Sequence, residues 1–172
     1  MQSSCSSAKG LALLELVLAI GVLAVASLFV LGRYSVSAKE LGFTELTGHV
    51  DQTLSDVRKL FGADADLFAS VSMGELKSRG GLGNFAVVGN VVNLPQSVRM
   101  TLAPITAFGV SGGGFAVALS NVGIPECVAL GSGVRDITGL TINERTVPLP
   151  VVVTILTSVC GEPNNALVFE SQ

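Results

Sequence analysis

The sequence predicts an α+β protein in which a long N-terminal helix packs on an antiparallel β-sheet. Three observations predict this class. Residues 11–31 form an apolar run, residues 46–61 carry a helical apolar stripe, and short β-prone runs separated by Gly and Pro follow residue 62. The chain has 172 residues, which leaves room for one globular domain after the helix.

The apolar run over residues 11–31 contains a single charge, the carboxylate of Glu15. A helix of this length extends about 31 Å, enough to cross a hydrocarbon core of roughly 30 Å. An ionised carboxylate is costly to hold in hydrocarbon, and no Lys, Arg or His in the run can pair with it. The apolar residues therefore predict a membrane segment, while Glu15 indicates that lipid is not its final surrounding.

Residues 1–10 form a polar leader, expected to be irregular, that ends in Lys9 and Gly10. Lys9-Gly10 followed by LALLE, residues 11–15, resembles the class III signal of type IV prepilins. The resemblance is strongest over residues 9–60. It implies that a prepilin peptidase cleaves between Gly10 and Leu11 and N-methylates Leu11. It also implies the type IVb group, because the first residue after the cleaved bond is not Phe, and the pilin fold for the whole chain.

Cleavage after Gly10 would create an α-amino group on Leu11, and this amine is the partner that Glu15 otherwise lacks. The resemblance accordingly implies a homo-oligomeric filament subunit. It would be inserted in the inner membrane as a precursor and assembled into an extracellular pilus with a peptidase and an assembly platform. Local melting of the helix accompanies assembly in this family. Gly21 is the candidate for that role, with small-residue packing as the alternative.

Beyond residue 31 the pattern becomes amphipathic, which predicts that residues 32–61 continue the helix and pack on a globular domain of residues 62–172. Gly62 is expected to end the helix. The apolar residues of the stripe recur at spacings of three and four: Leu46, Val50, Leu54, Val57 and Phe61.

The remaining predicted elements are short and bounded by Gly, Pro or Asn. In order, they are a helix over 67–77, a hairpin over 85–94 turning at Gly89-Asn90, a strand over 98–103 ended by Pro104, a turn at 112–114, a core strand over 115–120, a helix opened by Pro125, and strands over 140–143 and 166–170. Residues 151–159 fit either a strand, by their β-branched content, or a helix, by their length.

Three cysteines fall at positions 5, 127 and 160. Cys5 would leave with the leader, so Cys127 and Cys160 remain as a pair. In an oxidising compartment they would form a disulfide, and two buried free thiols are the alternative. In the family that the chain resembles, the segment between them corresponds to the variable, disulfide-bounded region.

Composition argues against several functions. Charged residues make up 13% of the chain and hydrophobic residues 49%, which suits a protein that buries much of its surface in an assembly. The net charge of −3, without a basic run after the leader, gives no electrostatic footprint for nucleic acid. The glycines of residues 80–83 lack the Lys-Ser/Thr of a P-loop.

No catalytic residue, metal site or cofactor is predicted, and the chain is not expected to be an enzyme. His49 is the only histidine, and a surface or packing role suits it best. Two rivals to the pilus subunit remain open. One is a minor pilin or secretion pseudopilin with the same fold, and the other is a monomeric signal-anchored periplasmic binding domain.

Overall fold

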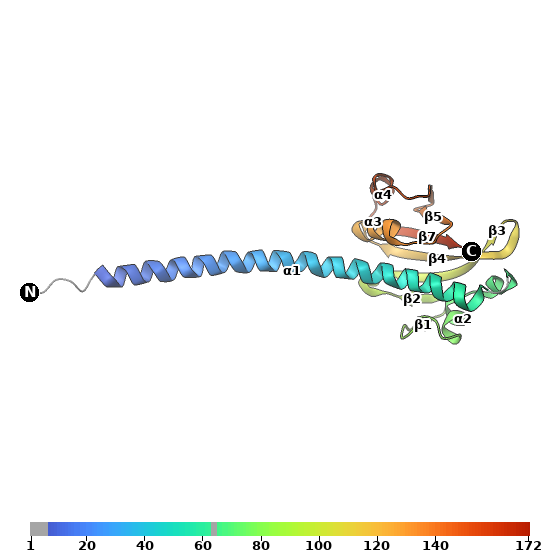
Figure 1. Cartoon of the computed structure of the whole chain (residues 1–172), viewed down its shortest axis with the longest axis horizontal. Coiled ribbons are helices and arrows are strands. Elements are labelled where there is room, and N and C mark those ends of the chain that lie inside the picture. Colours follow the sequence, from blue (N-terminus) through green and yellow to red (C-terminus); the bar gives the residue numbers. More distant parts are fainter. Residues whose placement is uncertain (1–6, 63–64) are drawn as a thin grey trace, which may run out of the picture. The chain divides into compact units, whose positions relative to one another are not determined.

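The computed structural model describes residues 7–62 and 65–172, with side chains for residues 17–25, 27, 42–62 and 68–172. The chain divides into two compact units, Met1–Leu41 and Gly42–Gln172, which we describe separately. Helix α1 (Ser7–Phe61) supplies the helix of the first unit and continues into the second (Figure 1). The predicted long helix is therefore confirmed.

Helix α1 begins at Ser7, four residues before the predicted start at Leu11. Residues 7–10 are helical, so the expectation of an irregular leader is wrong for this part. Ala8 and Lys9 are strong helix formers, and a helix already formed downstream extends at little cost.

In the second unit, the predicted apolar stripe of α1 is buried at every position, with Leu46, Val50, Leu54, Val57 and Phe61 at most 2% exposed. The helix ends at Phe61, and the N–H of the next residue donates to a carbonyl of the last turn over 2.8 Å. The predicted stop at position 62 is therefore confirmed.

The stripe packs on one seven-stranded sheet with the order β1-β2-β3-β4-β7-β5-β6, in which all neighbouring strands are antiparallel. This confirms the predicted α+β class. The strands are β1 (Val87–Val88), β2 (Val91–Asn93), β3 (Arg99–Ala107), β4 (Val110–Val122), β5 (Gly139–Ile142), β6 (Arg145–Val147) and β7 (Asn165–Ser171).

Alternate residues of the central strands face the core, as expected for a sheet with one covered face. Met100 and Leu102 of β3, Val117 of β4 and Phe169 of β7 are fully buried and belong to the same hydrophobic cluster as the stripe of α1. The last strand of the chain, β7, lies between β4 and β5 and joins the two halves of the sheet (Figure 1).

The predicted helix over 67–77 is instead two short helices, the 3₁₀ helix η1 (Ala65–Ser70) and α2 (Met73–Ser78). Ser72 separates them, because its backbone is extended and its Oγ accepts a hydrogen bond from the N–H of Glu75 at 3.2 Å. A serine in this position caps a new helix and does not continue an old one.

The expectation that Pro104 ends its strand is wrong, since β3 continues to Ala107 and Pro104 is paired with Phe115. The reason is the length of the neighbouring strand. β2 pairs with β3 only as far as Thr101, so the rest of that edge of β3 is unpaired. A proline is tolerated where the missing N–H has no strand to bind.

The predicted turn at 112–114 is also wrong, because these glycines lie within β4 and the chain turns earlier, at Phe108-Gly109. Because these glycines have no side chain, neighbouring backbone segments can lie close to β4. A Cβ on Gly114 would lie 2.7 Å from the carbonyl oxygen of Ser171, and one on Gly112, whose φ is 74°, would lie 2.8 Å from the Cα of Ala69. Any side chain at these positions would force neighbouring backbone apart.

The C-terminal part contains α3 (Ile124–Gly133), opened by Pro125 as predicted, and α4 (Val153–Val159). The segment 151–159, which fitted either a strand or a helix, therefore forms a helix over most of its length. The burial of this segment has the period of a helix, because Ile155 and Leu156 are covered, the next two residues are exposed, and Val159 and Cys160 are covered again. The predicted hairpin turning at Gly89 and the closing strand β7 are confirmed, whereas β6 was not predicted.

Candidate functional site

In the first unit, the side chains of residues 17–25 of α1 are apolar and exposed on all sides of the helix. The six large apolar residues of the segment 17–25 each have 58–68% of their surface exposed: Val17, Leu18, Ile20, Val22, Leu23 and Val25. A helix that is apolar all round is stable only when other apolar groups cover it. This exposed apolar helix is therefore a surface for lipid or for protein partners.

The predicted signal lies at the start of the same helix. The backbone of Gly10, Leu11 and Glu15 belongs to α1, but the side chains of residues 7–16 lie outside the described residues, so their roles stay predictions. Gly21 lies within the continuous helix, and a Cβ there would have no atom within 4 Å. The proposed melting at Gly21 also stays a prediction.

Among the described residues, no helical segment is both long enough and apolar enough to cross a membrane.

In the second unit, two arginines that sequence reasoning did not identify attach α1 to the rest of the domain. The first, Arg58, donates from Nε and Nη2 to Oγ of Ser171 at 3.1 and 2.7 Å, and from Nη2 to the carbonyl oxygen of Asp136. Ser171 is fully buried at the end of β7. The half-buried guanidinium thus fastens the last turns of α1 to β7 and to the segment before β5.

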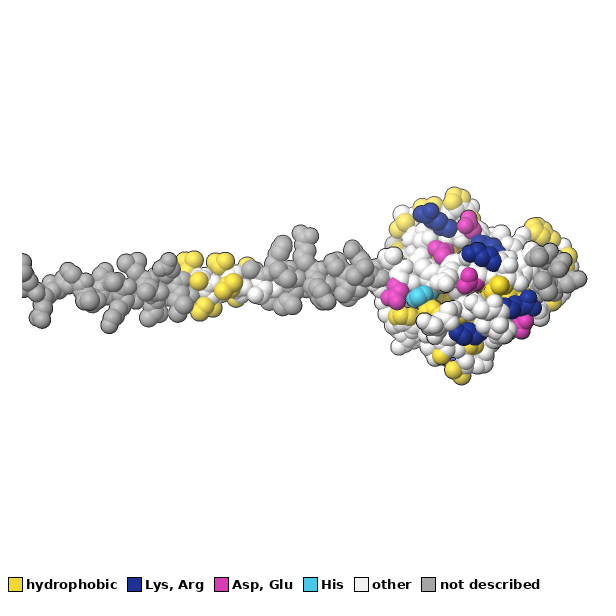
Figure 2. Space-filling view, turned by 60° about the horizontal axis from the view of Figure 1, so that its bottom comes forward, with side chains coloured by type: hydrophobic (Ala, Val, Ile, Leu, Met, Phe, Trp, Pro, Cys, Tyr) yellow, Lys and Arg dark blue, Asp and Glu magenta, His cyan; other side chains and the backbone are white. Residues whose placement is uncertain are grey.

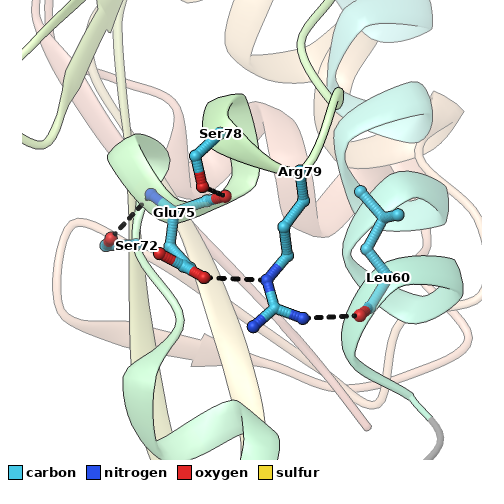
Figure 3. A network of polar contacts seen from close by, with 5 residues as sticks. All are labelled: Leu60, Ser72, Glu75, Ser78 and Arg79. Carbon is cyan, nitrogen blue, oxygen red and sulfur yellow. Dashed lines mark hydrogen bonds and ion pairs between the residues drawn. The ribbon is translucent and has the colours of Figure 1, made fainter.

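The second arginine, Arg79, fastens α2 to the end of α1 (Figure 3). Its Nε lies 2.8 Å from Oε1 of Glu75, and its Nη1 donates to the carbonyl oxygen of Leu60 at 3.3 Å. Its guanidinium also lies over the ring of Phe61, 4.4 Å from the centroid. A partly exposed ion pair adds little by itself, so the cation–π contact and the bond to a helix-terminal carbonyl carry most of this anchor.

His49 packs within the domain, as predicted. Its ring meets that of Phe85 edge-on with centroids 4.7 Å apart, and its Nε2 lies 3.6 Å from Oε1 of Glu45. Within the described part of the chain, no three His, Cys, Asp or Glu side chains gather to hold a metal ion. Over the face shown in Figure 2, acidic and basic side chains are interspersed and form no stripe of one sign.

The C-terminal region is closed by the disulfide between Cys127 of α3 and Cys160 after α4, with Cα atoms 5.8 Å apart. This confirms the predicted pairing over the alternative of free thiols. Both cysteines are fully buried. Because the bond joins α3 to the end of α4, it holds together two helices that the chain connects only through β5 and β6.

The comparisons with known proteins identify the fold. No protein-family model matches the sequence, and a search of the curated proteins finds no match. Among solved structures, the crystal structure of a type IVb pilin from Salmonella typhi is similar, with a TM-score of 0.56 and 22% sequence identity. The similarity covers 75% of this chain and 98% of the other. The chain therefore has the fold of a type IVb pilin, and the predicted pilin fold is confirmed.

Proposed function

We propose that this protein is a structural, non-enzymatic subunit of a type IV pilus filament. The observation that carries the proposal is the exposed apolar helix of residues 17–25, continuous with a domain that has the fold of a type IVb pilin. Such a helix needs covering, and a filament made of many copies supplies the cover from the helices of other subunits.

The subunit starts as a precursor in the inner membrane, with residues 11–31 in the bilayer. Lys9 keeps the leader on the cytoplasmic side, in agreement with the positive-inside rule, and the globular domain is translocated. A prepilin peptidase then cuts between Gly10 and Leu11 and methylates the new amino group. The mature subunit passes to an assembly platform and leaves the membrane for the extracellular filament.

Glu15 makes the filament more favourable than the bilayer for this helix. Covering each large apolar side chain is worth about 1.5–3 kcal/mol whether lipid or protein covers it, so the apolar residues alone favour neither surrounding strongly. An unpaired carboxylate is costly in lipid. In the filament it pairs with the Leu11 amine of an adjacent subunit, which removes that cost and sets the axial step between subunits.

The intact mass of the chain in sheared surface filaments tests the proposal. We expect a mass that lacks residues 1–10, includes one added methyl group and is two hydrogens lighter for the disulfide. Cells without prepilin peptidase provide the control and should contain only the full-length precursor in the membrane. A full-length chain in cells with a working peptidase would favour a plain membrane-tethered domain and would contradict the filament.

A further inference from the structure

The turn between β3 and β4 carries an aromatic side chain that the domain does not use. Phe108 is 90% exposed, and Val110 beside it is 49% exposed. Phe108 and Gly109 both have positive φ, 52° and 76°, the backbone of a two-residue turn that favours Asn and Gly. A bulky residue is strained in this conformation, and a ring this exposed gains no packing energy that could offset the strain. The requirements of the domain therefore do not account for a phenylalanine here.

An open groove of about 610 Å³ lies at another place on the same unit, between α1 and α3. Its lining is mainly small or apolar: Phe43, Thr47, Gly48, Ala129, Ser132 and Gly133. The two helices approach closely below it, since a Cβ on Gly133 would lie 3.0 Å from Cγ2 of Thr47. At one side Asp51 is engaged by the N–H of Arg135 at 3.3 Å. The groove is thus an open depression in the surface, lined mainly by small or apolar side chains and with room for one aromatic ring.

The β3–β4 turn and helix α3 lie at opposite ends of the Gly42–Gln172 unit (Figure 1). Strand β4 starts beside the turn, at Val110, and ends just before α3, which forms one wall of the groove. Its 13 residues extend about 43 Å. A copy placed with its turn in the groove of the next copy can repeat the same contact without limit, which is the property of a head-to-tail interface that builds filaments.

We propose that the Phe108 turn of one copy inserts into the α1–α3 groove of the next, as an axial contact between globular domains. This inference rests on the proposed filament and deepens it by naming a contact outside the apolar helix. A second copy is favoured over a membrane surface because residues 100–125 contain no charged residue, whereas adhesion to anionic lipid relies on Lys and Arg. Isolated aromatic anchors in such hollows commonly dominate the stability of an interface.

The test is intermolecular crosslinking in the full-length chain expressed in cells. Val110→Cys leaves the Phe108 ring in place, and Ser132→Cys lies in the groove and is exposed. On mild oxidation the double variant should give a ladder of covalent multimers, in both the membrane and the sheared fraction. Each single variant should give none, with Cys5 replaced by Ser in every chain so that an uncleaved leader contributes no thiol. As a matched control, Val110→Cys is combined with Val88→Cys, which is 70% exposed on β1 and outside the groove.

A third substitution distinguishes loss of the contact between copies from loss of domain stability. Phe108→Asn in the double-cysteine chain suits the positive φ, so the thermal stability of the domain should stay equal or rise. The yield of the ladder should fall by about tenfold because the anchor is lost. A yield that Phe108→Asn leaves unchanged, or an equal ladder from the Val88→Cys control, would overturn the inference.

The outcomes also separate this inference from the proposed function. Filaments without a ladder would overturn the axial contact and leave the filament subunit intact. If the wild-type chain formed no filaments, the proposed function would fail. The ladder in the membrane fraction would then still decide the contact: its presence would support head-to-tail association, and its absence would refute it.

Discussion

Asn143 donates a hydrogen bond from Nδ2 to Oδ1 of Asn165 over 2.8 Å, and this pair joins the elements of the C-terminal region. Asn143 also donates to the carbonyl of Val159 at the end of α4 and accepts from the N–H of Ala166. Asn165 is fully buried and donates to the carbonyl of Val122, the last residue of β4. Two amides thereby connect the β5–β6 turn, α4, β7 and β4 beside the disulfide.

Replacing Asn165 by Ala should lower the free energy of unfolding of the domain by about 2–4 kcal/mol. The substitution leaves the Val122 carbonyl and the amide of Asn143 without their buried partner. Urea unfolding followed by circular dichroism measures the change. Asn164→Ala, at the exposed neighbouring position, is the matched control and should remain within about 0.5 kcal/mol of wild type. Equal stability of the two variants would refute the role of the pair.

Removing the disulfide by the double change Cys127→Ser and Cys160→Ser should cost about 3–4 kcal/mol, because the unfolded chain regains the freedom of a closed loop with a sequence separation of 33. The thermal midpoint of the variant should also become insensitive to reducing agents, whereas that of the wild type should fall when they are added. A wild-type midpoint that reducing agents leave unchanged would show that the bond does not stabilise the domain.

Replacing Glu15 by Ala should abolish surface filaments while the subunit remains in the membrane, since the Leu11 amine then lacks its partner. Electron microscopy of cells and the amount of subunit in the sheared fraction report the result. Glu45→Ala removes an exposed carboxylate of the same helix that lies near His49 in the described structure, and it should leave filament yield unchanged. Normal filament yield from the Glu15→Ala chain would contradict the pairing model.

Replacing Gly10 by Leu should block removal of the leader, because a bulky residue then occupies the position before the cleaved bond. The chain should accumulate as membrane precursor, and its mass should still include residues 1–10. Ala8→Leu places the same bulk within the leader but away from the bond, and we expect it to be processed. A mature mass from the Gly10→Leu chain would place the cleavage elsewhere.

Local patterns predicted those features whose cause lies in neighbouring residues. The three- and four-residue spacing from Leu46 to Phe61 indicated which face of α1 would be buried, because the period of a helix is set by its own backbone. Gly62 and Pro125 marked a helix end and a helix start through their own backbone preferences. Gly89, with φ of 63°, likewise formed the predicted hairpin turn.

The features that local patterns missed depend on partners far along the chain. Pro104 stays in a strand because the pairing of β3 with β2 stops at Thr101, and Gly112 and Gly114 lie in β4 because backbone from η1 and β7 passes close to them. Strand β6 follows a turn at Asn143 and Glu144, both with positive φ, where an Asn-Glu pair gives a weaker signal than Asn-Gly.

The sequence by itself determined the long helix, its buried face and the α+β class, since each depends on residue type and short-range spacing. Only the tertiary structure decided that β7 lies between β4 and β5, that Asn143 meets Asn165, and that the β3–β4 turn and helix α3 lie at opposite ends of one domain. The physical reason is that such placements are set by the summed packing of distant segments, which no short stretch of chain encodes.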